Sequence, residues 1–196
     1  MPRITAIENI TLDGVMQAPG AKEEDTRGGF AHGGWAQPYA DEVAMQVAAA
    51  GMATEGALLF GRLTYESFHR AWAGRDDNPF SPVLDARHKY VASTTLRDPL
   101  PWRHSTLLAG DPAESVADLK SAAPEAEIAI LGSGELVRTL LAHDLIDNLQ
   151  LSIHPLVLGT GTRLFPVGGV RLPFTLVDAV TTTTGVQIAT YRRESP

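Results

Sequence analysis

The chain has 196 residues, of which 44% are hydrophobic and 20% charged, with a net charge of −7 and no cysteine. These values are typical of a globular domain with a sizeable core, and the scattered basic residues argue against a nucleic-acid partner. The lack of cysteine excludes disulfides, a thiol nucleophile and cysteine-ligated zinc. No apolar run approaches the ~20 residues that span a bilayer, and the N-terminus lacks a secretory pattern, so we expect a cytoplasmic protein with no membrane partner.

The N-terminal part of the chain combines one strand, a long loop and one helix. Residues 4–12 are predicted as a strand that ends at the turn-forming pair Asp13-Gly14. The next residues, 14–37, are rich in glycine and charge, and we call them the glycine-rich segment. A loop of this length is either functional or disordered. We favour an active-site flap, because disorder would expose Phe30 and Trp35, and we expect a helix over residues 41–53.

The middle of the chain alternates strands with helices, which implies right-handed crossovers and a largely parallel sheet. Strands are predicted at 56–60, 89–93, 105–109 and 127–131, and helices from Arg62, over 112–122 and over 135–142. The helix start at 111–114 is strong, with aspartate as cap, proline at the first helical position and glutamate closing a capping box. Residues 72–87 show no clear pattern.

The last third changes character. Residues 149–154 alternate apolar and polar side chains, and residues 174–180 are predicted to pair with 186–191 as a hairpin. No repeat, linker or change of composition divides the sequence. We therefore predict one α/β domain over residues 1–196, whose mainly parallel sheet ends in antiparallel C-terminal strands.

Three predicted strand ends carry residues suited to a nucleotide. Gly61 and Arg62 stand where a strand meets a helix, and helix N-termini with an arginine favour phosphate. The hydroxyls of Ser93-Thr94 follow the next strand, and Gly132-Ser133-Gly134 lies between a strand and a helix. Each has a structural alternative as a helix start, a cap or a tight turn. Parallel strands end at one edge, where such sheets bind ligands, so together they predict a nucleotide cleft.

Other well-known sites are poorly supported. The Rossmann fingerprint would need a third glycine at position 137, which is valine, and no P-loop or Gly-x-Ser-x-Gly elbow occurs. The six histidines stand singly, so we predict no metal. The candidate acids and bases are Asp13, Asp41, Glu42, His32, His88 and His154. Asp13 has an alternative role as turn former, and Asp41 or Glu42 as helix cap.

Several of these motifs resemble the dihydrofolate reductase superfamily. They are residues 61–67, Ser93-Thr94 after a strand, and residues 131–134, in that order and at similar spacing. More specifically, Thr11-Leu12-Asp13-Gly14 and residues 145–165 resemble the C-terminal reductase domain of the bifunctional riboflavin-biosynthesis deaminase-reductase. The resemblance covers nearly the whole chain and implies a three-layer αβα fold. The deaminase half needs a Pro-Cys-x-x-Cys segment, which this cysteine-free chain lacks.

The resemblance implies NADPH as hydride donor and a homodimer. Arg62 and Thr64 would hold phosphates, with Arg62 on the adenosine 2′-phosphate, and Ser93 and Thr94 would line the adenosine side. The pyrophosphate and nicotinamide ribose would lie on Gly132, Ser133, Gly134, Glu135 and Leu136. Asp13 would face the substrate, with Asp13 or Glu42 positioning it or relaying a proton.

Two function hypotheses follow. The first is an NADPH-dependent reductase of a small heterocycle or sugar imine, similar to 5-amino-6-(5-phosphoribosylamino)uracil reductase, with pterins as further substrates. The second is a catalytically silent module of the same fold that binds a nucleotide or pterin. Binding of NADPH without its oxidation would distinguish the second from the first.

Overall fold

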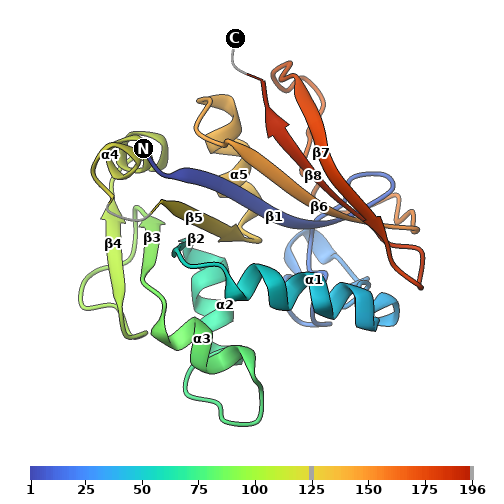
Figure 1. The fold of residues 1–196 in the computed structure, drawn as a ribbon, viewed down its shortest axis with the longest axis horizontal. Coiled ribbons are helices and arrows are strands. Elements are labelled where there is room, and N and C mark those ends of the chain that lie inside the picture. Colours follow the sequence, from blue (N-terminus) through green and yellow to red (C-terminus); the bar gives the residue numbers. More distant parts are fainter. Residues whose placement is uncertain (124–125, 195–196) are drawn as a thin grey trace. The chain divides into compact units, whose positions relative to one another are not determined.

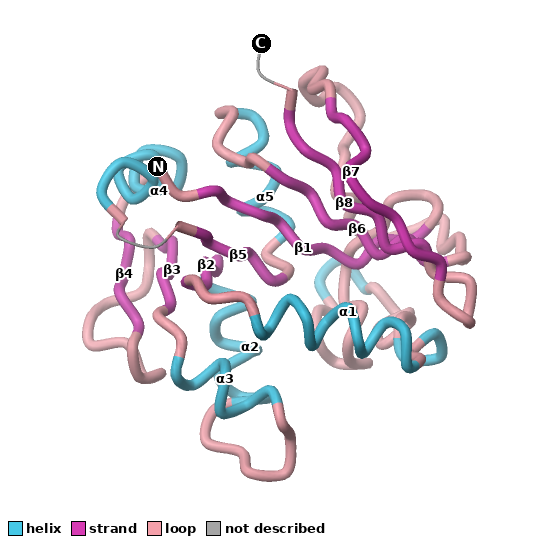
Figure 2. Tube along the Cα trace, viewed as in Figure 1, coloured by secondary structure: helices cyan, strands magenta, loops and turns pink. Residues whose placement is uncertain are grey.

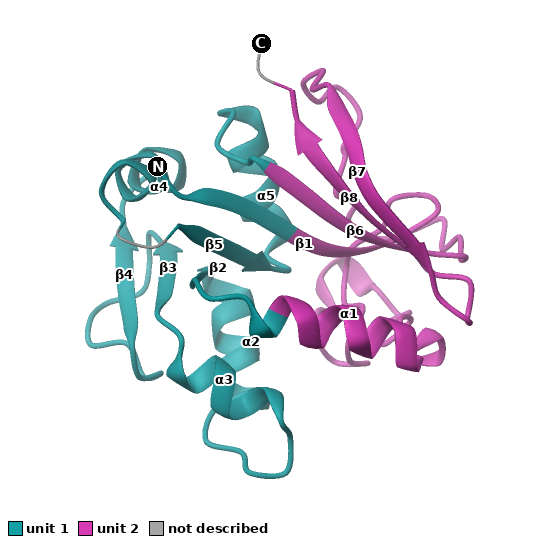
Figure 3. Ribbon diagram, viewed as in Figure 1, with its two compact units in different colours: residues 1–6, 52–147 teal, residues 7–51, 148–196 magenta. Residues whose placement is uncertain are grey.

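The computed structural model describes residues 1–123 and 126–194, and Figure 1 shows the course of the chain. The chain forms two compact units, which Figure 3 shows in different colours. Unit 1 contains residues 1–6 and 52–147, and unit 2 contains residues 7–51 and 148–196. That the whole chain behaves as one domain stays a prediction. None of the helices in the described residues is long and apolar enough to cross a membrane.

Hydrogen bonds order the eight strands as β4-β3-β2-β5-β1-β6-β8-β7 (Figure 2). Strand β1 (Arg3–Thr11) belongs by its first residues to unit 1 and by its later ones to unit 2. In unit 1 the pairs β2–β3, β2–β5 and β3–β4 are parallel, and in unit 2 the pairs β6–β8 and β7–β8 are antiparallel. The predicted α/β fold, a mainly parallel sheet ending in antiparallel C-terminal strands, is thereby confirmed.

Unit 1 follows the predicted alternation closely. Its elements are β2 (Ala57–Gly61), α2 (Arg62–Trp72), α3 (Phe80–Ala86), β3 (Lys89–Ser93), β4 (Ser105–Ala109), α4 (Pro112–Ala122), β5 (Glu127–Leu131) and α5 (Gly134–Ala142). The α4 cap is as predicted, because the Asp111 carboxylate accepts the amide protons of Ala113 and Glu114. Helix α2 contacts β2 and β3, α4 contacts β3 and β4, and α5 contacts β2.

Helix α3 lies within the stretch that showed no pattern. It has seven residues, too few for a clear apolar period, and side chains outside the helix bind to it. The fully buried Lys89 ammonium donates to the carbonyls of Leu84 and Arg87 at 2.8 and 2.6 Å, which caps the C-terminal end of the helix. The Trp102 indole donates to the Asp85 carboxylate at 2.6 Å.

Unit 2 contains α1 (Glu42–Ala53), β6 (Asn148–His154), β7 (Phe174–Thr181), β8 (Gln187–Arg193) and the short 3₁₀ turns η1 (Arg27–Gly29) and η2 (Gln37–Tyr39). Asp41 caps α1, because its carboxylate accepts the Ala44 amide proton at 2.8 Å. The same carboxylate accepts the Thr183 hydroxyl at 2.7 Å, which fixes the helix start to the β7–β8 turn.

The glycine-rich segment is folded against its own unit. Phe30 and Trp35 are buried in a cluster with Val15 and Ala18, and the Trp35 indole donates to the Gln17 carbonyl at 2.7 Å. This agrees with the argument from sequence that these two aromatic rings do not face solvent. Whether the segment moves during function stays a prediction.

Gly161 lies so close to this cluster that a side chain at this position should lower the stability of the protein. Gly161 has φ +105°, and a methyl group there would lie 2.7 Å from the Phe30 ring and 2.9 Å from Val15, whereas Gly159, at φ +72°, has open space. We expect Gly161→Ala to lower the free energy of unfolding by about 2–4 kcal/mol, from overpacking added to left-handed strain. Gly159→Ala, the matched control, should cost about 1–2 kcal/mol from strain alone. Urea unfolding measures both, and equal losses would contradict the packing argument.

Candidate functional site

The predicted cofactor residues of β2 and β5 meet in unit 1. The Gly61 amide donates to the Ser133 hydroxyl oxygen at 3.0 Å. A methyl group at Gly61 would lie 3.7 Å from Cβ of Leu136, and one at Gly132 would lie 3.6 Å from the Thr64 methyl. The structure therefore brings together residues that stand more than 60 positions apart in the sequence, since the Gly61–Ser133 bond spans 72 residues.

The turn after β5 has two consecutive residues in the left-handed region. Gly132 and Ser133 both have left-handed φ values, +65° and +63°, and α5 begins immediately afterwards at Gly134. A left-handed serine is uncommon, and its hydroxyl is held by the Gly61 amide. The first turn of α5 has amide groups without partners in the helix, which suits an anionic group such as a phosphate. Glu135 in this turn is exposed and forms an ion pair with Arg138.

Arg62 is the first residue of α2. It directly follows Gly61, whose amide donates to Ser133 of this turn. Its guanidinium is 3.1 Å from the Glu66 carboxylate, and the two side chains are 40% and 39% exposed. Such an exposed pair contributes little to stability and exchanges readily for a stronger anion. The planar donors of Arg62 therefore remain available to a phosphate.

Ser93 is the last residue of β3 and Thr94 follows it; Ala92 of the same strand pairs with Gly61. The Ser93 side chain is buried, and its oxygen accepts the amide protons of Thr95 and Leu96 at 3.1 and 3.0 Å. This is a serine turn, so Ser93 shapes the loop at the strand end. Thr94 is exposed. Of this pair, Thr94 is the residue whose side chain reaches solvent and hence a ligand.

Asp13, in unit 2, is fully engaged within the protein. Its carboxylate accepts the Thr11 hydroxyl at 2.6 Å and the amide protons of Leu158 and Gly159 at 3.2 and 2.9 Å, and it pairs with Arg163. The Thr11 hydrogen bond first, and then the two amides, lower the pKa of Asp13 to about 2. Asp13 is an anion at neutral pH, so it can orient groups but has no proton to donate.

Glu42 lies in the first turn of α1 and is exposed, with Gln46 donating to it at 3.3 Å. Among the candidate histidines, His154 is buried, and its Nε2 lies 3.0 Å from the Asn9 side-chain oxygen. The rings of Trp35 and Tyr39 meet it edge-on, and burial lowers the pKa of His154 to about 4, which keeps the imidazole neutral. No three acidic or histidine side chains in the described part of the chain gather closely enough to hold a metal.

One acid was missed by the sequence analysis. Glu8 of β1 is only 4% exposed, and its Oε1 has no hydrogen-bond partner among the described residues. The signal was present, because Ile4, Ala6 and Ile10 are buried on the same face of β1, so Glu8 occupies an apolar position in the alternation. Burial first, and the nearby Glu24 charge second, raise the pKa of Glu8 to about 8.

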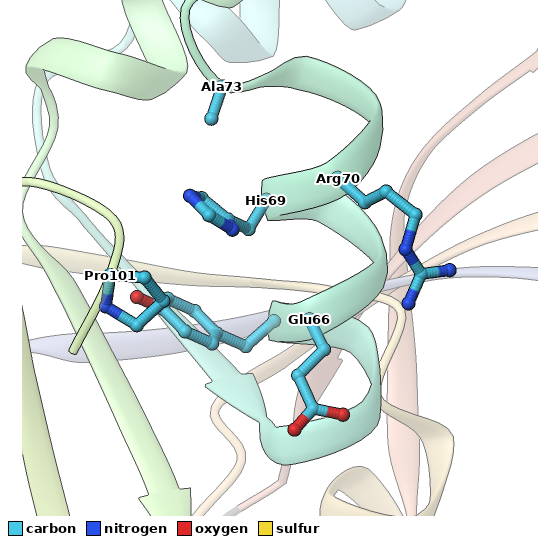
Figure 4. Close-up of a pocket in the computed structure, with 6 residues that line it drawn as sticks. Glu66, His69, Arg70, Ala73 and Pro101 are labelled. Atoms are coloured by element: carbon cyan, nitrogen blue, oxygen red, sulfur yellow. The ribbon is translucent and has the colours of Figure 1, made fainter.

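A separate open pocket of about 480 Å³ lies on the later turns of α2 (Figure 4). Its lining comes from α2, from the residue that follows the helix and from one loop residue, namely Tyr65, Glu66, His69, Arg70, Ala73 and Pro101. The His69 ring stacks on Tyr65, with centroids 6.4 Å apart and planes 9° from parallel. None of the predicted cofactor residues lines this pocket, so it does not form part of the nucleotide site.

The hydrogen bonds to Asp13 predict an acid-sensitive contribution to stability. Its pKa in the folded protein, about 2, is below the value of about 3.9 for an unfolded chain, so the stabilisation is present above pH 4 and is lost as pH falls through 2. We expect Asp13→Asn to lose about 2 kcal/mol at pH 7 and less at pH 3. The control is Asp118→Asn on the exposed side of α4. Urea unfolding at both pH values measures this, and a loss independent of pH would contradict it.

Comparisons with known proteins agree with this architecture. Residues 2–188 match the family of the RibD C-terminal domain. The chain is 27% identical over 134 residues to the uncharacterised protein YyaP of Bacillus subtilis strain 168, covering 66% of this chain and 69% of that one. A crystal structure of a candidate riboflavin biosynthesis protein from Shewanella sp. PV-4 is 23% identical, with a TM-score of 0.74 over 98% of this chain and 99% of the other.

Two further crystal structures share the fold. A pyrimidine reductase-like protein from Corynebacterium diphtheriae is 14% identical, with a TM-score of 0.67 over 100% of this chain and 93% of that one. RibD from Acinetobacter baumannii is 16% identical, with a TM-score of 0.62, and this chain spans 58% of its length. Since the family match covers nearly all of the sequence, the chain belongs to the RibD C-terminal domain family.

Proposed function

We propose that this protein is an NADPH-dependent reductase that transfers a hydride to a C=N or C=O bond of a small heterocycle or a sugar-derived imine. The observation that supports this most is the joining of the β2 and β5 ends through the bond from Gly61 to Ser133. Membership of the RibD C-terminal family supports reductase chemistry of the riboflavin type. The expectation of a cytoplasmic protein stays a prediction.

The residues present fit a dinucleotide phosphate. Gly132 has no side chain, Gly134 starts α5, and the amides there would hold the pyrophosphate with Ser133, Glu135 and Leu136 alongside. Arg62 would bind the 2′-phosphate and Thr64 a neighbouring phosphate oxygen, with Ser93 and Thr94 on the adenosine side. When bound, NADPH supplies the hydride. The protein would bind and orient the reactants, and the glycine-rich segment would exclude water from the substrate.

A ribosylaminopyrimidine phosphate, as in riboflavin synthesis, is the substrate we favour within this class. It needs a second basic group besides Arg62 for the sugar phosphate. Arg27 is bound to Asp25, and Arg163 is bound to Asp13. Lys22 of the glycine-rich segment is exposed, so we propose this lysine for the role. Asp13, held as an anion, would position the substrate.

The placement of the acids favours one alternative. Asp13 has no proton to donate, and Glu42 faces solvent, so neither has the setting of a proton donor. A catalytically silent module that binds a nucleotide or pterin would need no such donor. NADPH binding without oxidation in the presence of pterins, flavins and aminopyrimidines would establish this second function in place of the first.

Unit 2 leaves apolar surface uncovered, and we propose that it forms a homodimer through this surface. Helix α1 has no buried residue, although it is rich in alanine, valine and methionine, and Met45 is 60% exposed. Strand β7 exposes Leu176 and Val177 by 54% and 53%. Leu176 and Val177 are consecutive, and exposed apolar surface of this kind is a feature of protein interfaces.

Sedimentation at micromolar concentration tests the dimer. We expect the mass of two chains for the wild type and of one chain for Val177→Lys, because a lysine would be buried without a partner in the interface. Val167→Lys, at a position exposed outside β7, is the control and should remain dimeric. A monomeric wild type would contradict the proposal.

The cofactor assignment predicts different effects on two dinucleotides. Calorimetric titration without substrate should show micromolar binding of NADPH and much weaker binding of NADH. Arg62→Ala should weaken NADPH by ten- to a hundredfold, because a charged hydrogen bond to phosphate is worth about 1.5–3 kcal/mol, and should change NADH little. Arg70→Ala, an exposed arginine two turns along α2, is the matched control. Equal losses for both cofactors would contradict the role of Arg62, and no binding of either would contradict the reductase function.

A further inference from the structure

Glu66 belongs to the motif of residues 61–67, but the proposed function gives it no role. Its carboxylate lies 3.1 Å from the guanidinium of Arg62, one helical turn earlier, and the two side chains are 39% and 40% exposed. In Figure 4 the Glu66 side chain runs back toward the start of α2. Glu66 therefore occupies the group to which we assign the 2′-phosphate of NADPH.

The pairing of Glu66 with Arg62 is not the one that its position on the helix favours. Arg70 lies one turn further along α2, at the same spacing and in the order that stabilises helices, with the glutamate first. Arg70 is exposed and has no ion-pair partner in the described part of the chain. Since Glu66 pairs with Arg62 nevertheless, the start of α2 attracts an anion more strongly than Arg70 does.

The start of α2 has a physical reason to attract an anion. Arg62 is the first residue of the helix, and the first turn contains no acidic residue. The free amides and the partial positive charge of a helix start add to the charge of the guanidinium. Helix α4, in contrast, begins with the Asp111 cap and Glu114. In α2 the compensating charge comes from Glu66, one turn into the helix.

Glu66 can leave Arg62 without a shift of the helix. The preceding residue, Tyr65, is 1% exposed, and its hydroxyl donates to Ser105 at 3.2 Å and accepts the Trp102 amide proton at 3.0 Å. These bonds fix α2 at this turn. Glu66 itself lines the open pocket of about 480 Å³, which gives its side chain room to turn away. The exchange therefore needs only a change of side-chain rotamer.

We propose that Glu66 is a specificity-determining residue, which holds Arg62 as an internal counter-ion, competes with the 2′-phosphate and so limits the preference for NADPH over NADH. This role rests on the proposed NADPH-dependent function. A phosphate monoester carries about two negative charges at neutral pH and displaces the single carboxylate. The neutral 2′-hydroxyl of NADH does not, so Arg62 stays paired with Glu66 when NADH binds.

The same competition assists release of the oxidised cofactor. Hydride transfer leaves the 2′-phosphate unchanged, so Arg62 alone would hold the product dinucleotide as firmly as NADPH. Glu66 offers the guanidinium another partner as the phosphate departs. Because differences in affinity between related complexes lie mostly in the dissociation rate, we expect Glu66 to act mainly on that rate.

The test compares Glu66→Gln with Glu55→Gln by calorimetric titration of NADPH and of NADH. Glutamine keeps the size of the side chain and removes its charge. We expect Glu66→Gln to bind NADPH about three- to tenfold more tightly, from lost competition and lost repulsion at an exposed site, and NADH within about twofold of the wild type. Glu55 is exposed before β2, at the other end of that strand from Arg62, so its variant should change neither affinity.

Two further measurements follow the carboxylate itself. In stopped-flow displacement, Glu66→Gln should release NADP⁺ more slowly by a factor close to its gain in affinity. In protein labelled with ¹³C at glutamate carboxyls, the NMR signal that is absent in Glu66→Gln should move when NADPH saturates the protein and stay in place with NADH. A signal that NADPH leaves unmoved would overturn the proposal.

The outcomes separate this role from the proposed function. Unchanged or weaker NADPH binding by Glu66→Gln, with a wild type that binds NADPH, would overturn the role of Glu66 and leave the reductase function standing. Equal tightening of NADPH and NADH would also overturn it, because Glu66 would then act through overall charge. A wild type that binds neither dinucleotide would contradict the reductase function, and the role of Glu66 with it.

Discussion

The carboxylate of Asp13 is the interaction on which the arrangement of unit 2 depends. It accepts hydrogen bonds from Leu158 and Gly159, 145 and 146 positions away, and so fastens the end of β1 to the segment that follows β6. Around it the backbone bonds from Met16 to Thr162 and from Leu164 to Gly14 run between the same two segments. The glycine-rich segment therefore starts from a fixed point. The Asp13 carboxylate thus stabilises the structure of unit 2, and its hydrogen bonds within the protein leave it less able to bind a substrate.

Most of the fold could be predicted from the sequence because its signals are local. The cap of α4 at Asp111, the apolar run of β2 and the glycines after β5 each depend on a few neighbouring residues. Helix α3 could not be predicted, since the bonds of Lys89 and Trp102 that hold it come from residues outside the helix. The sequence pattern there contains no period long enough to recognise.

The site shows the same division. Gly61 and Ser133 were predicted from separate turns, and their direct contact follows from β2 and β5 being neighbours. The properties of the acids could not be predicted, because the pKa of a carboxyl depends on groups that only the folded chain brings near. Asp13 is ionised by amides far along the chain, and Glu8 is neutral through burial and a loop carboxylate. Glu8 had one sequence signal, a charge at an apolar strand position, which is easily taken for an edge residue.

The two ends of the loop in the glycine-rich segment are held together by hydrogen bonds within unit 2. Gly34 and Ala36 donate to the carbonyls of Ala18 and Pro19, and the Gln37 side chain donates to Gly20, so residues 21–33 form a loop whose ends are already closed. Such an Ω-loop can change length at a small entropic cost, which grows only slowly with the number of residues. Insertions, deletions or grafts between these two ends are thus a low-cost route by which evolution or design could alter what the protein accepts as a substrate.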